Sequence, residues 1–243
     1  MNKKVFLAFP ILLALILSCV ITFLYGKSIG VDIIYHVNVA KEYAVGNFGG
    51  VLDLNLLVNG NGIYPPALHL LLVPSVWLGV PYQFTGFLQI LFLPLAIASF
   101  GFLVYKTYGL EASLFGMMIV LGSFAYVDRV LAVQPQSIDF ILLPLAYYFL
   151  LNAKDNKLLV TSIVGFYNHG LLNLAIFSGV LIKKLKQKKW IATYLIAIAP
   201  LLIVTLYYLV TNQTGPNQFG VDQGFWSDPY YLITYVRLPT LGF

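Results

Sequence analysis

The chain has 243 residues, of which 60% are hydrophobic and only 9% are charged, and its formal net charge is +5. Soluble domains carry about a quarter of charged residues, so this composition excludes a soluble globular protein and indicates a membrane protein. The lysines gather in short clusters, NKK near the start and KKLKQKK at 183–189. Such clusters are typical of the cytoplasmic ends of membrane spans, so we expect no nucleic-acid partner.

The first predicted element is a membrane span over residues 5–25. MNKKVFLAFPILLALILSCV has the basic start and apolar stretch of a secretory signal. The apolar run continues through VITFLYG, however, which gives it the length of about twenty residues that a bilayer requires. We therefore expect an uncleaved anchor with a cytoplasmic N-terminus, and the single cysteine, Cys19, lies inside it without a partner for an internal disulfide.

A polar stretch rich in Gly and Asn follows at 26–66 and includes GNFGG and VNGNGIYPP. It is too polar to lie in lipid and long for a connector, so we predict an ordered, functional outer loop. The apolar segment ALHLLLVPSVWLGV after it is shorter than a full span. That length favours an interfacial or partly inserted helix, and residues 26–83 as a whole are predicted to form an outer loop with interfacial helices.

The remaining apolar segments predict a helical bundle over residues 84–210. We expect an all-α, polytopic transmembrane bundle of about six to seven membrane helices in a single membrane domain, 1–243. YNHG interrupts one segment, which is then either a bent span or a hairpin of two half-helices. Residues 211–243 are predicted to be an outer polar and aromatic tail. The expected spans after the outer loop cover 84–105, 110–127, 137–152, 158–182 and 190–210.

Two threadings of the chain through the membrane are open. If the short helix after Pro66 crosses fully, Lys106 and the KDNK turn at Lys154 lie outside. If it stays in the interface and YNHG forms the apex of a hairpin, every lysine-bearing short connector lies in the cytoplasm. Lys and Arg near span ends determine orientation, so the second threading is favoured. It places the following on the outer side: Asp32, His36, Asp128, Arg129, Asp139, His169 and the tail.

The segment VDIIYHVNVAKEY, which begins at Val31, predicts an amphipathic helix from about Asp32 to Val45. Helical spacing places Ile33, Val37, Ala40 and Ala44 on one face and Asp32, Tyr35, His36 and Tyr43 on the other. Resting on the membrane interface, the helix would present a carboxylate and an imidazole one turn apart, which suits a general base. Asp32 could equally cap the helix, and two residues alone do not form a metal site.

A resemblance rests on three stretches of this sequence. GVDIIYHVNVAKEYAVGNFGG places an Asp soon after the first span, IYPPALHLLL ends the first loop, and DRVLAVQPQSIDFILLPLAYYFLL starts a span with an Asp. This pattern, over roughly the first 150 residues, resembles the C-type membrane glycosyltransferases. That superfamily includes protein O-mannosyltransferases, aminoarabinose transferases and the catalytic subunit of oligosaccharyltransferase. The WWD-type acceptor motif of the last group is missing, which argues against that branch.

The resemblance implies a transferase that moves a sugar from a polyprenyl-phosphate carrier to an acceptor outside the cytoplasm. Asp32 would be the first-loop acid, a general base or an acceptor-positioning carboxylate, and the second acid would be Asp128 or Asp139. With His36, the expected catalytic residues are thus Asp32, His36 and Asp139. No clear DxD or ExD pair is present, so no cofactor is assigned and a divalent metal ion stays an open option.

Further polar residues are candidates for substrate binding together with Asp128. Arg129 could clamp a lipid phosphate with its planar fork, or it could be a snorkelling interface residue or the partner of Asp128. His169 interrupts an apolar segment, where an ionisable group is a functional candidate, or it forms a backbone-bonded turn. Tyr64 is expected to shape the loop where it re-enters the membrane, and His69 could face the site or a neighbouring helix.

The leading hypothesis is a multi-pass enzyme of the cell membrane whose partners are a lipid-linked sugar donor, membrane lipids and an unknown acceptor, with further subunits left open. A transporter or permease, with YNHG as a broken-helix binding site, is one alternative. A non-catalytic membrane scaffold is another. Two related halves would favour transport, and the sequence shows no second half resembling the first.

Overall fold

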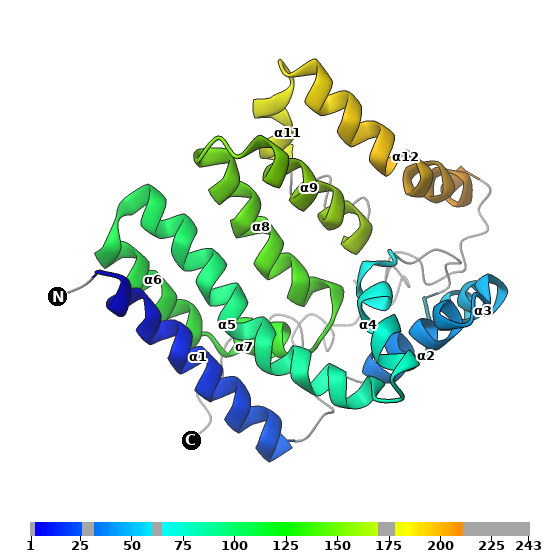
Figure 1. Ribbon diagram of the computed structural model, residues 1–243, viewed down its shortest axis with the longest axis horizontal. Helices are drawn as coiled ribbons and strands as arrows, with labels where there is room; N and C mark the ends of the chain where they lie inside the picture. Colours follow the sequence, from blue (N-terminus) through cyan, green and yellow to red (C-terminus); the bar gives the residue numbers. More distant parts are fainter. Residues whose placement is uncertain (1–2, 26–31, 60–64, 170–177, 211–243) are drawn as a thin grey trace, which may run out of the picture.

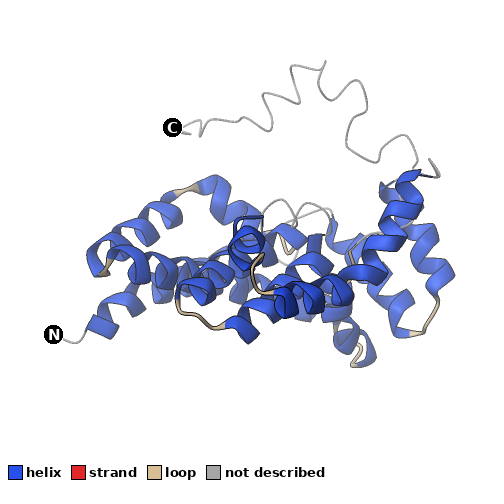
Figure 2. Ribbon diagram, turned by 90° about the horizontal axis from the view of Figure 1, so that it is seen from above, coloured by secondary structure: helices blue, strands red, loops and turns tan. Residues whose placement is uncertain are grey.

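The computed structural model describes residues 3–25, 32–59, 65–169 and 178–210, and within these ranges the chain forms helices and no strand (Figures 1 and 2). This confirms the all-α class for the described part of the chain. The predicted tail at 211–243 lies outside the described residues. In chain order the helices are α1 (Lys3–Tyr25), α2 (Asp32–Ala44), α3 (Phe48–Asn59), α4 (Ala67–Trp77), α5 (Pro81–Tyr108), α6 (Leu110–Gly122), α7 (Phe124–Leu131), α8 (Pro135–Leu151), α9 (Asp155–His169), α11 (Ser178–Lys184) and α12 (Lys188–Val210).

Helices α1 and α5 are long and apolar enough to cross a membrane, through Phe6–Leu24 and Pro81–Tyr108. They pack along each other, and Ser18 Oγ of α1 donates a hydrogen bond to the carbonyl oxygen of Ile90 in α5 at 2.9 Å. The opposite face of α1 exposes a continuous apolar stripe, which suits contact with lipid rather than water. Its members are Phe9, Leu12, Ile16, Val20 and Phe23.

The span predicted at 110–127 is broken in the structure. Helix α6 ends at Gly122, Ser123 has an extended backbone, and α7 continues at an angle of 76° to α6. The span predicted at 110–127 therefore corresponds to a bent pair of helices, which counts as one span only if the break is included. Two helices can cross a membrane by length and composition, or three if α6 and α7 count as one bent span, and α4 and α8 are apolar but shorter. This number lies below the six to seven expected.

Small residues allow α5 and α6 to approach closely. Ser113 Oγ of α6 donates to the carbonyl oxygen of Gly101 in α5 at 2.7 Å, and the side chain of Met117 lies directly over Gly101. A close backbone approach of this kind, sealed by a serine hydroxyl, is typical of helices that pack in a membrane. The contact belongs to the larger of the two main cores, which α1, α2, α4, α5, α6 and α7 build.

Helices α8, α9, α11 and α12 form the second core. Phe166 of α9 and Tyr194 of α12 are almost completely buried there. The hydroxyl of Tyr167 also donates to the carbonyl oxygen of Ala197 at 2.9 Å, which ties α9 to α12. The hairpin expected around YNHG is described only up to His169, where α9 ends.

The predicted outer loop contains three helices. Helix α2 agrees with its prediction and buries Ile33, Val37 and Ala40 as expected. However, Tyr35 and His36, which were predicted to face outward, are also buried because α4 covers this face. The prediction of an imidazole displayed on an open polar face was therefore wrong. Helix α3, which lies in the Gly- and Asn-rich stretch, was not predicted as a separate element.

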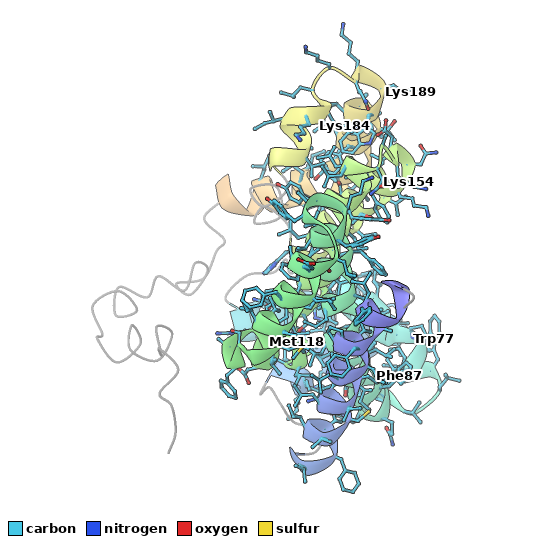
Figure 3. The ribbon with its side chains drawn as sticks, turned by 90° about the vertical axis from the view of Figure 1, so that its left-hand side faces the viewer. Trp77, Phe87, Met118, Lys154, Lys184 and Lys189 are labelled. Atoms are coloured by element: carbon cyan, nitrogen blue, oxygen red, sulfur yellow. The ribbon has the colours of Figure 1, made fainter. Side chains whose placement is uncertain are left out.

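The ends of the helices divide the molecule into two sides (Figure 1). The beginning of α1 and the α5–α6, α8–α9 and α11–α12 connections lie along one side, whereas α2, α3, α4 and the start of α8 lie on the other. Figure 3 shows Lys154, Lys184 and Lys189 together at the first of these sides, far from Trp77 of α4. We refer to the first side as the lysine side and to the second as the loop side.

Candidate functional site

Asp139 lies in the second turn of α8, near the loop side. The start of this helix is firmly capped: Pro135 occupies the first turn, and the backbone N–H of Gln134 donates to Ser137 Oγ at 3.0 Å. Ser137 Oγ in turn donates to the carbonyl oxygen of Arg129 at 3.0 Å, which fixes α7 against α8. A carboxylate near a helix start is favoured by the helix dipole, so this position suits an ionised Asp139.

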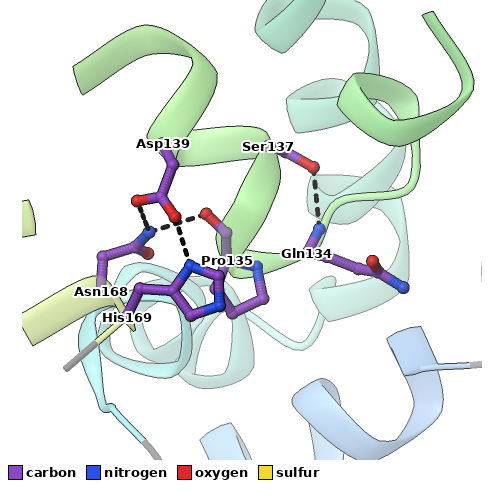
Figure 4. Close-up of polar contacts among 6 residues, drawn as sticks. All are labelled: Gln134, Pro135, Ser137, Asp139, Asn168 and His169. Carbon is purple, nitrogen blue, oxygen red and sulfur yellow. Dashed lines mark hydrogen bonds and ion pairs between the residues drawn. The ribbon is translucent and has the colours of Figure 1, made fainter. Parts of the chain in front are cut away.

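Two side chains at the end of α9 hold this carboxylate (Figure 4). Nδ2 of Asn168 donates to Asp139 Oδ1 and to the carbonyl oxygen of Pro135, both at 2.7 Å. Nδ1 of His169 forms a short hydrogen bond with Asp139 Oδ2. Asn168 is fully buried and Asp139 is 9% exposed. Both oxygens of the carboxylate therefore have partners, and the imidazole has a fixed orientation.

The Asp139–His169 pair opens into a cavity of about 290 Å³. Its polar lining comes from Asp139, His169 and Gln136. Gln136 Oε1 and Asn168 Oδ1 are buried and accept no hydrogen bond from the described residues. Buried acceptors usually have a donor, so the Gln136 oxygen in the lining indicates that a ligand with a hydroxyl or N–H group can be accommodated here. The other lining residues are Phe100, Tyr126, Phe140, Leu143 and Pro144.

A second polar pair joins α2 to α4. Nδ1 of His36 lies 2.9 Å from Nε2 of His69, and both side chains are almost completely buried. Tyr35 and Tyr43 surround the pair, with ring centroids 5.8 and 6.2 Å from that of His69. Burial lowers the pKa of His36 to about 4, and burial together with the charge of His36 lowers the pKa of His69 well below its usual value. Both imidazoles are therefore neutral at pH 7.

Helix α4 connects the two pairs. It packs against α2 through the histidines, and it also contacts α8 and α9. Figure 1 shows α4 between α2 and the adjoining ends of these two helices. The predicted outer loop, through α4, therefore packs beside α8, which carries Asp139, and α9, which carries His169. A site built from the loop and these helices requires this arrangement.

The structure brings together some of the predicted site residues and separates others. Asp139 meets His169, and His36 meets His69. Asp128 and Arg129 are exposed on α7 and do not line the cavity. Asp32 is the first residue of α2, but its side chain is not among those described. Tyr64 lies outside the described residues.

Asn168 and Gln136 were not predicted as site residues. Both lie next to residues or motifs that had been singled out: Asn168 precedes His169 within YNHG, and Gln136 lies in the QPQS stretch before Asp139. Polarity within an apolar segment was the available signal. As for a divalent metal ion, each of the two pairs supplies two side chains, and the described residues contain no cluster of three or more His, Cys, Asp or Glu.

The chain matches no model of a known protein family, no curated protein and no solved structure. The chemistry of the site therefore carries the functional argument.

Proposed function

We propose that this chain is a multi-pass membrane glycosyltransferase. It moves a sugar from a polyprenyl-phosphate donor to an acceptor outside the cytoplasm, and Asp139 and His169 are its acid–base pair. The observation that carries this proposal is the buried Asp139 carboxylate, bound by His169 in the wall of a largely apolar cavity. Buried ionisable groups of this kind in membrane proteins are costly and are usually retained for function.

The geometry suits proton transfer from an acceptor hydroxyl. An ionised carboxylate only accepts hydrogen bonds, so Nδ1 of His169 donates to Asp139 and Nε2 is left as the basic atom. As the acceptor oxygen bonds to the anomeric carbon of the sugar, its proton passes to Nε2. The bond from this carbon to the phosphate oxygen breaks, and the phosphate leaves with the electron pair. Asp139 stabilises the imidazolium that forms.

The cavity also suits a sugar. Gln136 Oε1, a lining acceptor without a donor among the described residues, matches a hydroxyl group of a sugar. The rings of Tyr126 and Phe140, with centroids 4.7 Å apart, provide an apolar wall against which a sugar ring can pack. Polar groups placed in a mostly apolar pocket are typical of small-molecule sites.

The first-loop acid, Asp32, keeps the acceptor-positioning part of its expected role, because His169 takes the acceptor proton in this proposal. His36 bonds to His69 and thereby fixes α2 against α4, which contacts α8 and α9. Asp32 lies one turn before His36 on the same helix, so this bond would fix the helix that carries the acid. In this proposal His36 positions Asp32 rather than reacting itself, and Arg129 on the exposed face of α7 remains the candidate for the donor phosphate.

The membrane orientation belongs to the proposal as well. The lysine side would face the cytoplasm, because positively charged connectors are retained there, and the loop side would face outward. Helices α8 and α12 would then cross the cell membrane together with α1, α5 and the bent α6–α7 pair, and the segment from α9 to α11 would enter and leave it on the cytoplasmic side as a hairpin. This gives a bundle of about six membrane helices.

A transporter is the second candidate, favoured by the break between α6 and α7. Discontinuous helices commonly line transport sites, and a buried Asp–His pair can relay a proton. The two functions differ in their product, since a transporter leaves the substrate chemically unchanged. A scaffold subunit would tolerate neutralisation of Asp139, whereas neither an enzyme nor a proton-coupled transporter would.

The testing experiment incubates membranes containing the full chain with radiolabelled polyprenyl-phosphate sugars and measures transfer to endogenous acceptors. Asp139→Asn and His169→Gln should each lower transfer at least about a hundredfold. Glu111→Gln is the matched control, because Glu111 is an exposed carboxylate at the start of α6 on the lysine side. Transfer equal in all four proteins would remove the pair from catalysis, and no transfer by the unmodified chain would refute the proposed function.

A further inference from the structure

The lysine side contains a second polar pocket, which the proposed reaction does not use. It lies between the first turns of α9 and α12 and has a volume of about 430 Å³. Asp155 and Asn156 line it from α9, and Gln187, Lys188, Lys189 and Trp190 line it from the start of α12. Figure 3 shows Lys184 and Lys189 close to Lys154 at this end of the molecule.

The charge around this pocket is strongly one-sided. The segment 154–189 contains seven lysines and one acidic residue, Asp155. That carboxylate already has its partners: Lys184 Nζ lies 2.5 Å from Oδ1, and the Gln187 amide in its favoured orientation donates to Oδ2 at 3.3 Å. Within the described residues Lys188 and Lys189 form no ion pair. Two ammonium groups at the pocket are therefore available for an anion from outside the protein.

The backbone adds to this positive potential. Helical hydrogen bonding begins at Leu158 in α9 and at Ile191 in α12, so the amides of the preceding turns belong to helix starts. Both helix dipoles thus present their positive ends at the same pocket, where they favour a phosphate group. The lysines and the two helix starts therefore both favour the binding of an anion at this pocket.

The surface below the pocket is apolar. Trp190 stacks on Tyr194 at an interplanar angle of 17°, and its indole N–H donates to the carbonyl oxygen of Asp155 at 3.2 Å, which fixes the pocket wall. One to two turns further along α12, Leu195 and Ile196 are 50% and 74% exposed. A ligand with a phosphate at one end and hydrocarbon at the other matches the cationic pocket and the apolar surface of α12 next to it.

We infer that this pocket binds the phosphodiester headgroup of an anionic phospholipid, with Lys188 and Lys189 as its cationic contacts and the acyl chains along α12. A free phosphate would use the lysines but not the exposed leucine and isoleucine below them. The inference concerns the lysine side alone, so it holds or fails independently of glycosyl transfer.

The experiment measures lipid binding by the purified full chain in detergent micelles, by native mass spectrometry and by the shift in thermal unfolding. Phosphatidylglycerol should bind and raise the unfolding temperature, whereas phosphatidylcholine and inorganic phosphate should do so much more weakly. The Lys188→Gln, Lys189→Gln double variant should bind phosphatidylglycerol about thirtyfold more weakly, since each of the two lysines near an anionic lipid surface contributes on the order of 1 kcal/mol.

The matched control is the Lys154→Gln, Lys186→Gln double variant, which removes the same charge from exposed positions on the same side but outside the pocket. It should bind within about twofold of the unmodified chain, since charges outside the pocket act only through screened surface potential. Equal losses in both double variants would show diffuse surface attraction and overturn the inference. So would equal shifts by phosphatidylcholine or inorganic phosphate, or no binding by the unmodified chain.

A further variant keeps every charge, so it tests the pocket even if the lysine substitutions disturb folding. Thr193 is exposed and lines the pocket, so Thr193→Trp should fill it and weaken phosphatidylglycerol binding while the lysines remain. Undiminished binding by this variant would contradict the assignment of the headgroup to the pocket.

Discussion

Nδ2 of Asn168 lies 2.7 Å from Oδ1 of Asp139, and the same nitrogen donates at 2.7 Å to the carbonyl oxygen of Pro135. One side chain at the end of α9 therefore satisfies two acceptors in the first two turns of α8. Because Asn168 is fully buried, no water can replace it without repacking. The contact fixes the position of the Asp139 carboxylate and, through it, that of His169.

Removal of this amide should destabilise the protein. Asn168→Ala removes the amide that donates to two buried acceptors, so we expect the free energy of unfolding to fall by about 1–3 kcal/mol. Denaturation in detergent, followed by circular dichroism, measures the change. Asn152→Ala is the matched control: its amide makes one bond at the end of α8, at a half-buried position, and should cost less than about 1 kcal/mol. Equal losses in the two variants would contradict the special role of Asn168.

The buried pair of His36 and His69 should make stability depend on pH. Burial holds the pKa of His36 at about 4 in the folded state, whereas the unfolded chain has the ordinary value of 6.5. As the pH falls below 6.5, the unfolded state binds protons that the folded state does not. Stability should therefore be complete above pH 6.5 and fall by up to about 1.4 kcal/mol per pH unit for each histidine as the pH approaches 4.

Thermal unfolding of the full chain at pH 7.5 and pH 5 measures this dependence. The His36→Gln, His69→Gln double variant should lose much less stability over this range than the unmodified chain, because it lacks both titrating groups. The range stops at pH 5 so that most carboxylates remain ionised. The same loss in both proteins would show that other groups cause the acid sensitivity.

Gly101 should be sensitive to the addition of a single methyl group. A Cβ atom there would lie 2.2 Å from Sδ of Met117, whose side chain is buried between α5 and α6. We expect Gly101→Ala to cost about 1–3 kcal/mol through overpacking. Gly122→Ala is the control, because nothing lies within 4 Å of its added methyl group. If Gly101→Ala lowered the free energy of unfolding no more than Gly122→Ala does, this would contradict the close approach of α5 and α6.

The proposed orientation predicts which sides are accessible from outside the cell. In a Cys19→Ser background, Val45→Cys on the loop side should react with a membrane-impermeant maleimide in intact cells, since Val45 is 77% exposed. Lys154→Cys on the lysine side should react only after permeabilisation. Labelling of both positions in intact cells would contradict the assignment of the two sides to opposite faces of the membrane.

Most of the helices could be predicted from the sequence. The span predicted at 84–105 and the helix predicted from Asp32 agree with α5 and α2 within a few residues, because long apolar runs and helical periodicity are local signals. The break at Ser123 was not predictable in this way, because the apolar run continues through it. Where such a run bends depends on which neighbouring helix covers it.

The candidate site was only partly predictable for the same reason. Asp139 was a candidate through the resemblance, as an acid near the start of a span, and His169 because it interrupts an apolar segment. Their pairing, however, depends on the packing of α8 against α9. His36 was expected at the surface, because helical periodicity shows which residues share a face and not whether another helix covers it. Its partner, His69, is 33 residues away in the chain.

Chemical rescue tests the central claim, that the Asp139–His169 pair transfers a proton, most directly. His169→Ala should abolish sugar transfer from the polyprenyl-phosphate donor, and added imidazole should restore a measurable part of it by entering the enlarged cavity. Asp139→Asn should be inactive with or without imidazole, because its loss leaves any imidazole without an ionised partner. Full activity of His169→Ala would contradict the claim, and so would an inactive variant that imidazole cannot restore while its folding remains intact.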